Sequence, residues 1–415
     1  MTASAERFAF AKVALANPGM IRVRPDVTLF MSRYMRRFRV RRSGRNLVLH
    51  SHLPPLNSPA YSRFVARHLV DRSPGPSHAQ IAVTNACPQD CTYCYNKQRS
   101  GTPMDSETIL RVVDELKAMG VCWLGLTGGE PLLQPDLVEI TREASSGCAV
   151  KLFTTGCGLT RRRAEELAGA GLFSTAVSID HWQGEVHDAG RRLPGAFESA
   201  LEALDVLKRT QGMHVSVSSV VSREMIARGD VHRLLSYLAG LQIDEAWLSE
   251  VKPTLRPFWH DGLVIGEEQR LQLAAVQDEY NRRPGMTVNY LGHFEGAETF
   301  GCNAGCKMVY VDAYGEVSPC VFLPMSFGNV RERPLLEIVE EMRAAFPGQD
   351  RCFINDNYRL FAESDGRLPL DRSSSTELAA RAIRRQPAAF TRVLGAKASR
   401  RTRSRTRETT AAIGA

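Results

Sequence analysis

Residues 87–94 have the sequence CPQDCTYC, which places three cysteines at C-x3-C-x2-C spacing directly after an apolar run at residues 81–85. Thiolates are soft ligands, and three of them this close together can bind three irons of a cubane iron–sulfur cluster. The fourth iron is then open to bind a small molecule and react with it. A structural zinc site would instead offer C-x2-C pairs and four ligands, so zinc is the weaker interpretation, as are purely structural cysteines.

Short apolar runs alternate with amphipathic helical patterns from residue 79 onward. Strands are expected at 79–85, 121–126, 149–154, 174–180, 213–220 and 244–249. Helices are expected near 105–119, 135–146, 160–170, 195–210 and 229–240. This alternation predicts a parallel sheet with helical crossovers. Such sheets bind ligands at the carboxyl ends of their strands, where the motifs described here all fall.

A glycine pair followed by an acidic residue, Gly128-Gly129-Glu130, comes after the second expected strand. Glycines at a strand end let the backbone approach a ligand closely, and the neighbouring carboxylate can receive a ligand ammonium. Together with the cysteine triplet, this motif resembles the radical S-adenosylmethionine (radical SAM) enzymes over residues 78–355. The resemblance implies a partial (β/α)6 barrel in which the open iron chelates SAM and the Gly-Gly-Glu motif holds its methionyl amine.

Four further residues are assigned by this resemblance. Tyr93 is expected to pack near the adenine of SAM, and Ser178, at the end of the fourth strand, to contact SAM. A loop arginine is expected to bind the SAM carboxylate, since the forked guanidinium fits it, and spacing does not choose between Arg191 and Arg192. The structural alternatives are that Ser178 is bonded only to backbone and that Tyr93 only shields the cluster. The family often has asparagine at the position of Thr155, so a structural role is expected there.

A second set of cysteines lies downstream, at Cys302, Cys306, Cys320 and Cys352. With Gly315 ahead of Cys320, it resembles the SPASM/twitch extension of radical SAM enzymes, which carries auxiliary clusters. No cysteine closely follows Cys320, so one auxiliary 4Fe–4S cluster is expected rather than two. Four thiolates would close this cubane and three would leave a second open iron, with zinc as the alternative. Cys122 and Cys148 are expected to be small buried packing residues. Cys157, at a strand end near the SAM site, is expected to pack in the core, with a role as hydrogen-atom donor as the alternative.

The net charge of +8 is concentrated in the flanks of the chain. Residues 1–75 carry 14 Lys and Arg against 3 Asp and Glu, and residues 372–415 carry 11 against 2. The chain is expected to divide into a basic N-terminal extension (1–77), a radical SAM core (78–295), an auxiliary-cluster domain (296–371) and a disordered basic tail (372–415). Residues 33–42 interleave arginines with large apolar residues, which suits either a packed extension or an element lying on a lipid surface.

These features predict a radical SAM enzyme, an oxidoreductase or transferase with SAM and two 4Fe–4S clusters as cofactors. The resemblance implies that the reduced first cluster cleaves SAM to a 5′-deoxyadenosyl radical, which abstracts a hydrogen from the substrate. The auxiliary cluster would accept an electron or anchor that substrate. A small molecule, either a natural-product or a cofactor precursor, is the expected substrate, and flavodoxin or ferredoxin the expected electron donor. No general base or substrate-binding residue is identified.

Maturation of a ribosomal peptide and modification of a lipid are the alternative functions. Residues 1–75 show no strand–helix alternation typical of a peptide-recognition module, which argues against peptide maturation. A non-enzymatic iron–sulfur or zinc module on nucleic acid is opposed by the acidic middle of the chain. The ten cysteines cluster at motif spacings, and the sequence lacks both a signal-peptide pattern and an apolar run of ~18 residues. A cytoplasmic location is therefore expected.

Overall fold

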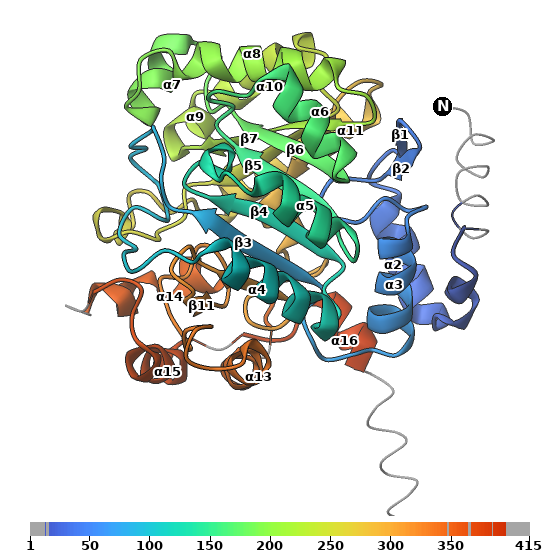
Figure 1. Ribbon diagram of the computed structural model, residues 1–415, viewed down its shortest axis with the longest axis vertical. Coiled ribbons are helices and arrows are strands. Elements are labelled where there is room, and N and C mark those ends of the chain that lie inside the picture. Colours follow the sequence, from blue (N-terminus) through green and yellow to red (C-terminus); the bar gives the residue numbers. More distant parts are fainter. Residues whose placement is uncertain (1–12, 14–15, 347, 364–366, 384, 396–415) are drawn as a thin grey trace, which may run out of the picture.

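The computed structural model describes residues 13, 16–346, 348–363, 367–383 and 385–395. Its central feature is a sheet of nine described strands in the order β11-β10-β3-β4-β5-β6-β7-β8-β9 (Figure 1). Neighbouring strands are parallel except for β10 and β11. The strands are β3 (His78–Thr84), β4 (Trp123–Gly128), β5 (Ala149–Thr154), β6 (Leu172–Ser178), β7 (His214–Val221), β8 (Glu245–Glu250), β9 (Thr287–Tyr290), β10 (Met308–Val311) and β11 (Val317–Ser318).

Helices connect the successive parallel strands. They are α4 (Ser106–Met119), α5 (Leu137–Ser145), α6 (Arg161–Gly169), α7 (Gly184–Arg191), α8 (Ala196–Arg209), α9 (Arg223–Ala227), α10 (Asp230–Gly240) and α11 (Glu267–Arg282), with the short turns η3 (Pro131–Leu133) and η4 (Arg256–Phe258). The Asp105 side chain caps α4 by accepting from the Thr108 N–H at 2.8 Å, and Gly120 ends it with φ of 101°. Strands β3–β8 and the five expected helices lie within two residues of their predicted positions. The partial (β/α)6 barrel is therefore confirmed.

Three strands of this sheet, β9, β10 and β11, were not predicted. β10 lies in the segment expected to form a separate cluster domain, yet it pairs in parallel with β3, Val309 opposite Ala79. The antiparallel strand β11 then ends the sheet. The cysteine-rich segment is therefore continuous with the main sheet and lies beside the strand that leads to the first cysteine set.

The C-terminal part is more ordered than the sequence suggested. It contains α12 (Leu291–Phe294), α13 (Leu335–Ala345), α14 (Phe353–Ala362), α15 (Arg372–Arg381) and α16 (Ala389–Gly395). The prediction of a disordered tail from residue 372 is wrong for the two last helices, because Leu378 is buried in the main core and Phe390 packs on Phe300 with ring centroids 4.9 Å apart. Residues 396–415 of that predicted tail lie outside the described residues.

The N-terminal extension packs against the barrel. It comprises η1 (Pro18–Arg22), α2 (Pro25–Met35), β1 (Arg41–Ser43), β2 (Asn46–Val48), α3 (Pro59–Phe64) and η2 (Val65–Val70). The expectation that residues 1–75 lack strands alternating with helices is therefore wrong, because the antiparallel pair β1–β2 lies between α2 and α3. In the arginine-rich stretch, Tyr34 and Phe38 are buried, whereas Arg33, Arg36 and Arg37 are exposed. The packed interpretation of this stretch is therefore the one the structure supports. Among the residues described, none of the helices has the length and apolar character needed to span a bilayer.

Candidate active site

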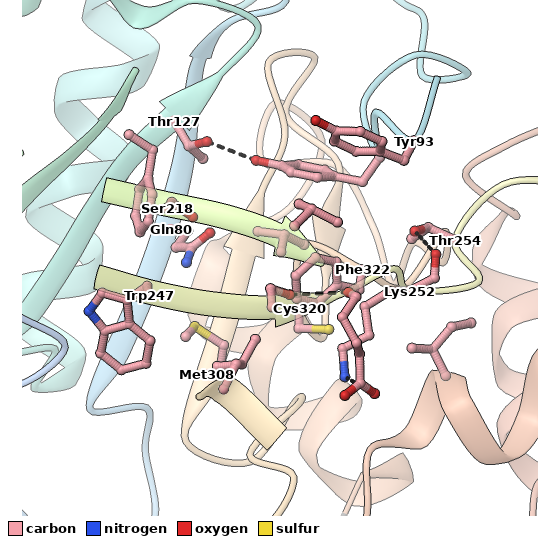
Figure 2. A pocket seen from close by; sticks show the side chains of 18 of the residues that line it. Gln80, Tyr93, Thr127, Ser218, Trp247, Lys252, Thr254, Met308, Cys320 and Phe322 are labelled. Atoms are coloured by element: carbon pink, nitrogen blue, oxygen red, sulfur yellow. Dashed lines mark hydrogen bonds and ion pairs between the residues drawn. The ribbon is translucent and has the colours of Figure 1, made fainter. Parts of the chain in front are cut away.

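A cavity of about 310 Å³ runs through the inside of the barrel to the loops at the carboxyl ends of the strands. Figure 2 shows Tyr93 and Thr127 on one side of it, with Cys320, Phe322 and Lys252 across from them. Both sets of cysteines contribute to its wall: Cys87, Cys91, Cys94, Cys302, Cys320 and Cys352. Motifs that are far apart in the sequence therefore face one shared space.

The first cysteine set lies on the loop that leaves β3. Two backbone N–H groups of this loop donate to the carbonyl oxygens of Gly190 and Arg191 at the end of α7, both at 3.2 Å. Burial raises the pKa of the Cys87 thiol to about 11, and it also raises the pKa values of Cys91 and Cys94. Metal ligands are thiolates, so binding of a cationic metal centre would have to deprotonate these thiols.

Gly128 and Gly129 carry the end of β4 across the start of this loop. A Cβ at Gly128 would lie 2.1 Å from the Thr84 carbonyl oxygen, and a Cβ at Gly129 would lie 2.2 Å from that of Ala86. Gly128 also has φ of +135°, which residues with a Cβ rarely adopt. The Gly129 N–H donates to the Thr84 carbonyl at 2.8 Å. Both glycines line the cavity, and their missing side chains are what lets the two segments meet.

Glu130, the third residue of the motif, is turned away from the cavity wall. Its side chain is 0% exposed. The carboxylate accepts hydrogen bonds from the Thr154 hydroxyl (2.7 Å), from the N–H and hydroxyl of Thr155 (both 2.6 Å) and from the Leu132 N–H (3.0 Å). It therefore fixes the turn after β5, whereas Thr155 lines the cavity.

The two candidate arginines point in different directions. Arg191 is buried and lines the cavity, while Arg192 is exposed, with φ of 52°, and pairs with Asp90 at 3.0 Å. The Arg191 guanidinium donates to Asp180 from Nε (2.9 Å) and Nη2 (2.7 Å), and the Tyr93 hydroxyl donates to the same carboxylate. Burial opposes ionisation of Asp180, but these partners outweigh it and lower its pKa below the usual value. The geometry thus selects Arg191 as the arginine able to meet a ligand in the cavity.

The other predicted residues divide between the cavity wall and the core. Ser178, the last residue of β6, lines the cavity, as does Tyr93. Cys122 and Cys148 are buried, and their thiols donate to backbone carbonyls at 3.3 and 3.2 Å. Cys157 is not among the residues of the cavity wall. A packing role therefore suits the first two of these cysteines.

Three cysteines of the second set come together at the cavity. The backbone N–H of Cys302 donates to the segment just before Cys352 at 2.7 Å, and the side chains of the two cysteines are hydrogen-bonded to each other. Burial raises the pKa of the neighbouring Cys320 to about 12. Cys306 instead lies against Gly348, where an added Cβ would be 3.5 Å from its sulfur, and it is not among the residues of the cavity wall.

The donor chemistry fits iron–sulfur clusters. Two groups of three thiols reach the wall of one cavity, and each group offers the three thiolates that bind a cubane with one open iron. The thiols of each group share the cavity wall, but in the described part of the chain no three His, Cys, Asp or Glu side chains converge closely enough to hold a single metal ion.

Comparisons with known proteins agree with this geometry. Residues 81–224 match the radical SAM superfamily model and residues 302–359 match that of the SPASM iron–sulfur cluster-binding domain. The AdoMet-dependent heme synthase of Methanosarcina barkeri is 30% identical over 284 residues, which cover 62% of this chain and 80% of that protein. The PqqA peptide cyclase of Ruegeria pomeroyi is 34% identical over 157 residues, covering 36% and 41%.

The fold also matches solved structures. Streptococcus suis SuiB bound to S-adenosylmethionine superposes with a TM-score of 0.52 at 16% identity, covering 66% of this chain and 68% of that one. The chain belongs to the radical SAM superfamily and carries a SPASM domain. It is an enzyme whose cofactors are SAM, a 4Fe–4S cluster and auxiliary iron–sulfur clusters bound by the SPASM domain.

Sequence reasoning missed three polar residues at the site. Asp180 and Lys252 follow the fourth and sixth barrel strands, and Gln80 lies within the first. The positions of Asp180 and Lys252 just after the carboxyl ends of strands could have indicated a role at the site. For Gln80, the signal was a polar residue within a mainly apolar strand.

Proposed function

We propose that this enzyme abstracts a hydrogen atom from a small molecule, a cofactor or natural-product precursor. The observation that carries the proposal is the cavity shared by both cysteine sets, because it gives a substrate access to both cofactor sites. Its volume of about 310 Å³ lies at the lower end of the ~300–1,000 Å³ of small-molecule sites, and SAM and the clusters would share this space with the substrate. A reduced 4Fe–4S cluster held by Cys87, Cys91 and Cys94 would supply the electron for cleavage of SAM to methionine and the 5′-deoxyadenosyl radical.

Each residue of the SAM site has a proposed task. Asp180 holds the Arg191 guanidinium in place, so that Arg191 can bind the SAM carboxylate. The backbone at Gly128 and Gly129 approaches the methionyl amine, while Glu130 holds the adjoining turn. Tyr93 packs near the adenine and Ser178 contacts SAM. The cluster ligands are Cys87, Cys91 and Cys94.

The auxiliary cluster is proposed to bind Cys302, Cys320 and Cys352. These three line the cavity and Cys306 does not, which favours three thiolates and an open iron over a closed set of four. The radical SAM core is proposed to span residues 78–295 and the cluster segment residues 296–371. Flavodoxin or ferredoxin would supply electrons.

The relatives support two substrate classes. A relative that this chain covers to 80% of its length is named for heme synthesis, which favours a cofactor precursor. A second candidate is peptide maturation, because the PqqA peptide cyclase is 34% identical over the 157 matched residues. The position of the cavity inside the barrel favours the small molecule.

The test is an anaerobic assay of 5′-deoxyadenosine formation by the reconstituted, reduced enzyme with SAM. Addition of a low-mass extract fraction should stimulate product formation, and protease treatment of that fraction should not abolish the stimulation. Protease-sensitive stimulation would assign the enzyme to peptide maturation instead. A Cys91→Ser variant provides the control without radical formation. Absence of 5′-deoxyadenosine from enzyme with both clusters present and reduced would contradict the radical chemistry.

A further inference from the structure

Lys252 is a buried cation on the cavity wall, two residues after the end of β8. The residue is 4% exposed, and Figure 2 shows its side chain near Cys320 and Phe322. Its ammonium lies 6.0 Å from the centre of the Phe322 ring. Nothing in the SAM site described above requires a cation at this position.

The Lys252 ammonium touches the second cysteine set directly. Nζ lies 3.3 Å from the Cys352 sulfur, 3.3 Å from Glu250 Oε1 and 3.2 Å from Glu295 Oε2. Two carboxylates at ion-pair distance keep the lysine charged even though it is buried. The lysine is therefore a fixed positive charge against a cysteine sulfur that itself faces the cavity.

The carboxylate behind the lysine is held in place by several elements. Glu250 also accepts from the Asn355 side chain at 2.5 Å and from the Tyr290 hydroxyl, and it lies 3.4 Å from Arg270. These partners come from β9, α11 and α14, so the network joins the last barrel strand to the cluster segment. A lysine that merely neutralised Glu250 would not need to reach Cys352.

We propose that Lys252 is a positioning residue for the auxiliary cluster, holding the Cys352 thiolate and raising the reduction potential of the cluster. The proposal rests on Cys352 being a cluster ligand, as assigned above. Hydrogen bonds to the sulfurs and nearby charge are main determinants of cluster potential. A positive charge favours the reduced state because that state carries one more electron, and burial strengthens the effect. An auxiliary cluster tuned upward in this way accepts an electron more readily.

The experiment isolates the auxiliary cluster in the full-length chain. Cysteines 87, 91 and 94 are replaced by alanine, the protein is reconstituted anaerobically, and iron content and an EPR-monitored redox titration are recorded. Lys252→Met should lower the reduction potential of the cluster. At a fixed solution potential, the ratio of reduced to oxidised cluster should fall about tenfold, which corresponds to a shift of 59 mV for a one-electron couple. Lys252→Arg should restore most of the potential. Glu295→Gln should shift it in the opposite direction, because a negative charge is removed.

Lys307→Met is the matched control. Lys307 also lines the cavity, but its ammonium binds the backbone carbonyls of Ser73 (2.6 Å) and Gly75 (3.0 Å), and it adjoins Cys306. Its loss should leave the potential unchanged. A shift with Lys307→Met but not with Lys252→Met would overturn the proposal and favour Cys306 as the ligand.

The outcomes also separate this inference from the proposed function. Loss of all cluster iron in the triple-alanine protein would refute the auxiliary-cluster assignment itself. A cluster that is present, with a potential that neither Lys252→Met nor Glu295→Gln changes, would refute the role of Lys252 alone. If Lys252→Met does not fold, the upward shift with Glu295→Gln and the retained potential of Lys252→Arg decide the question.

Discussion

The Glu130→Gln substitution tests whether this carboxylate positions the SAM pocket or touches SAM. One carboxylate oxygen accepts from the Thr155 N–H and hydroxyl, and the other accepts from the Leu132 N–H and the Thr154 hydroxyl. Whichever oxygen becomes an NH2 group, one buried backbone N–H then faces a donor. An unsatisfied buried donor costs about 1–3 kcal/mol, so the free energy of unfolding should fall by about 2 kcal/mol. SAM affinity should fall less than about fivefold, or about 1 kcal/mol.

Two measurements on one set of variants decide between the roles. Urea unfolding of the apoprotein gives the free energy of unfolding, and anaerobic calorimetry on the reconstituted enzyme gives SAM affinity. Thr154→Val is the matched control, because it removes one of the same hydrogen bonds and leaves the carboxylate in place. It should lower the free energy of unfolding with little effect on SAM binding. Unchanged stability of Glu130→Gln, with SAM affinity reduced tenfold or more, would refute the positioning role.

Further outcomes follow from the same geometry. Arg191→Met should weaken SAM binding, measured by calorimetry, by about tenfold to a hundredfold, because charged hydrogen bonds are lost. Arg192→Met removes an exposed group and should change the same affinity less than about threefold. Cys352→Ser should lower the iron content from about eight to about four per chain, whereas Cys306→Ser should leave it near eight by colorimetric assay. Burial raises the pKa of Glu245, but hydrogen bonding and nearby cations outweigh it and lower that pKa to about 2. The stability it contributes, at most about 3 kcal/mol, is thus present above pH 4.5 and lost as the pH falls toward 2. Glu245→Gln should flatten the apoprotein unfolding free energy over that range, and an identical pH profile would contradict the assignment.

The barrel strands could be predicted because their signals are local. Each is a short apolar run bounded by caps such as Asp105 and Gly120, which act within one turn of their helix. The choice between Arg191 and Arg192 could not be made, because it depends on where α7 ends and how the chain turns there. The task of Glu130 was equally hidden, since its hydroxyl partners lie on the next strand of the sheet.

Long-range pairing accounts for the rest of what the sequence did not show. β10 is four residues long and gains its place by pairing with β3, which lies more than two hundred positions earlier in the chain. The polar sequence of α15 suggested disorder, but Leu378 and Ala379 bury enough apolar surface to fix one face of that helix. Contacts of this kind depend on the assembled fold and leave no periodic pattern in the segment itself.

The contacts of Ser51 show that the N-terminal extension is part of the barrel interior. Its N–H donates to both oxygens of Glu245 at 3.1 Å, its hydroxyl accepts from the Lys151 ammonium at 2.5 Å, and its carbonyl accepts from the Trp123 indole at 2.7 Å. Buried charges such as these are costly unless they are paired, so the extension satisfies the polar groups at the amino ends of the strands. At the carboxyl ends, the cysteines and glycines line the cavity and are available to cofactors. The extension also forms part of the cavity wall through His52, and Tyr34 of the arginine-rich stretch is held inside by a hydrogen bond between its hydroxyl and His50 Nε2 at 2.8 Å.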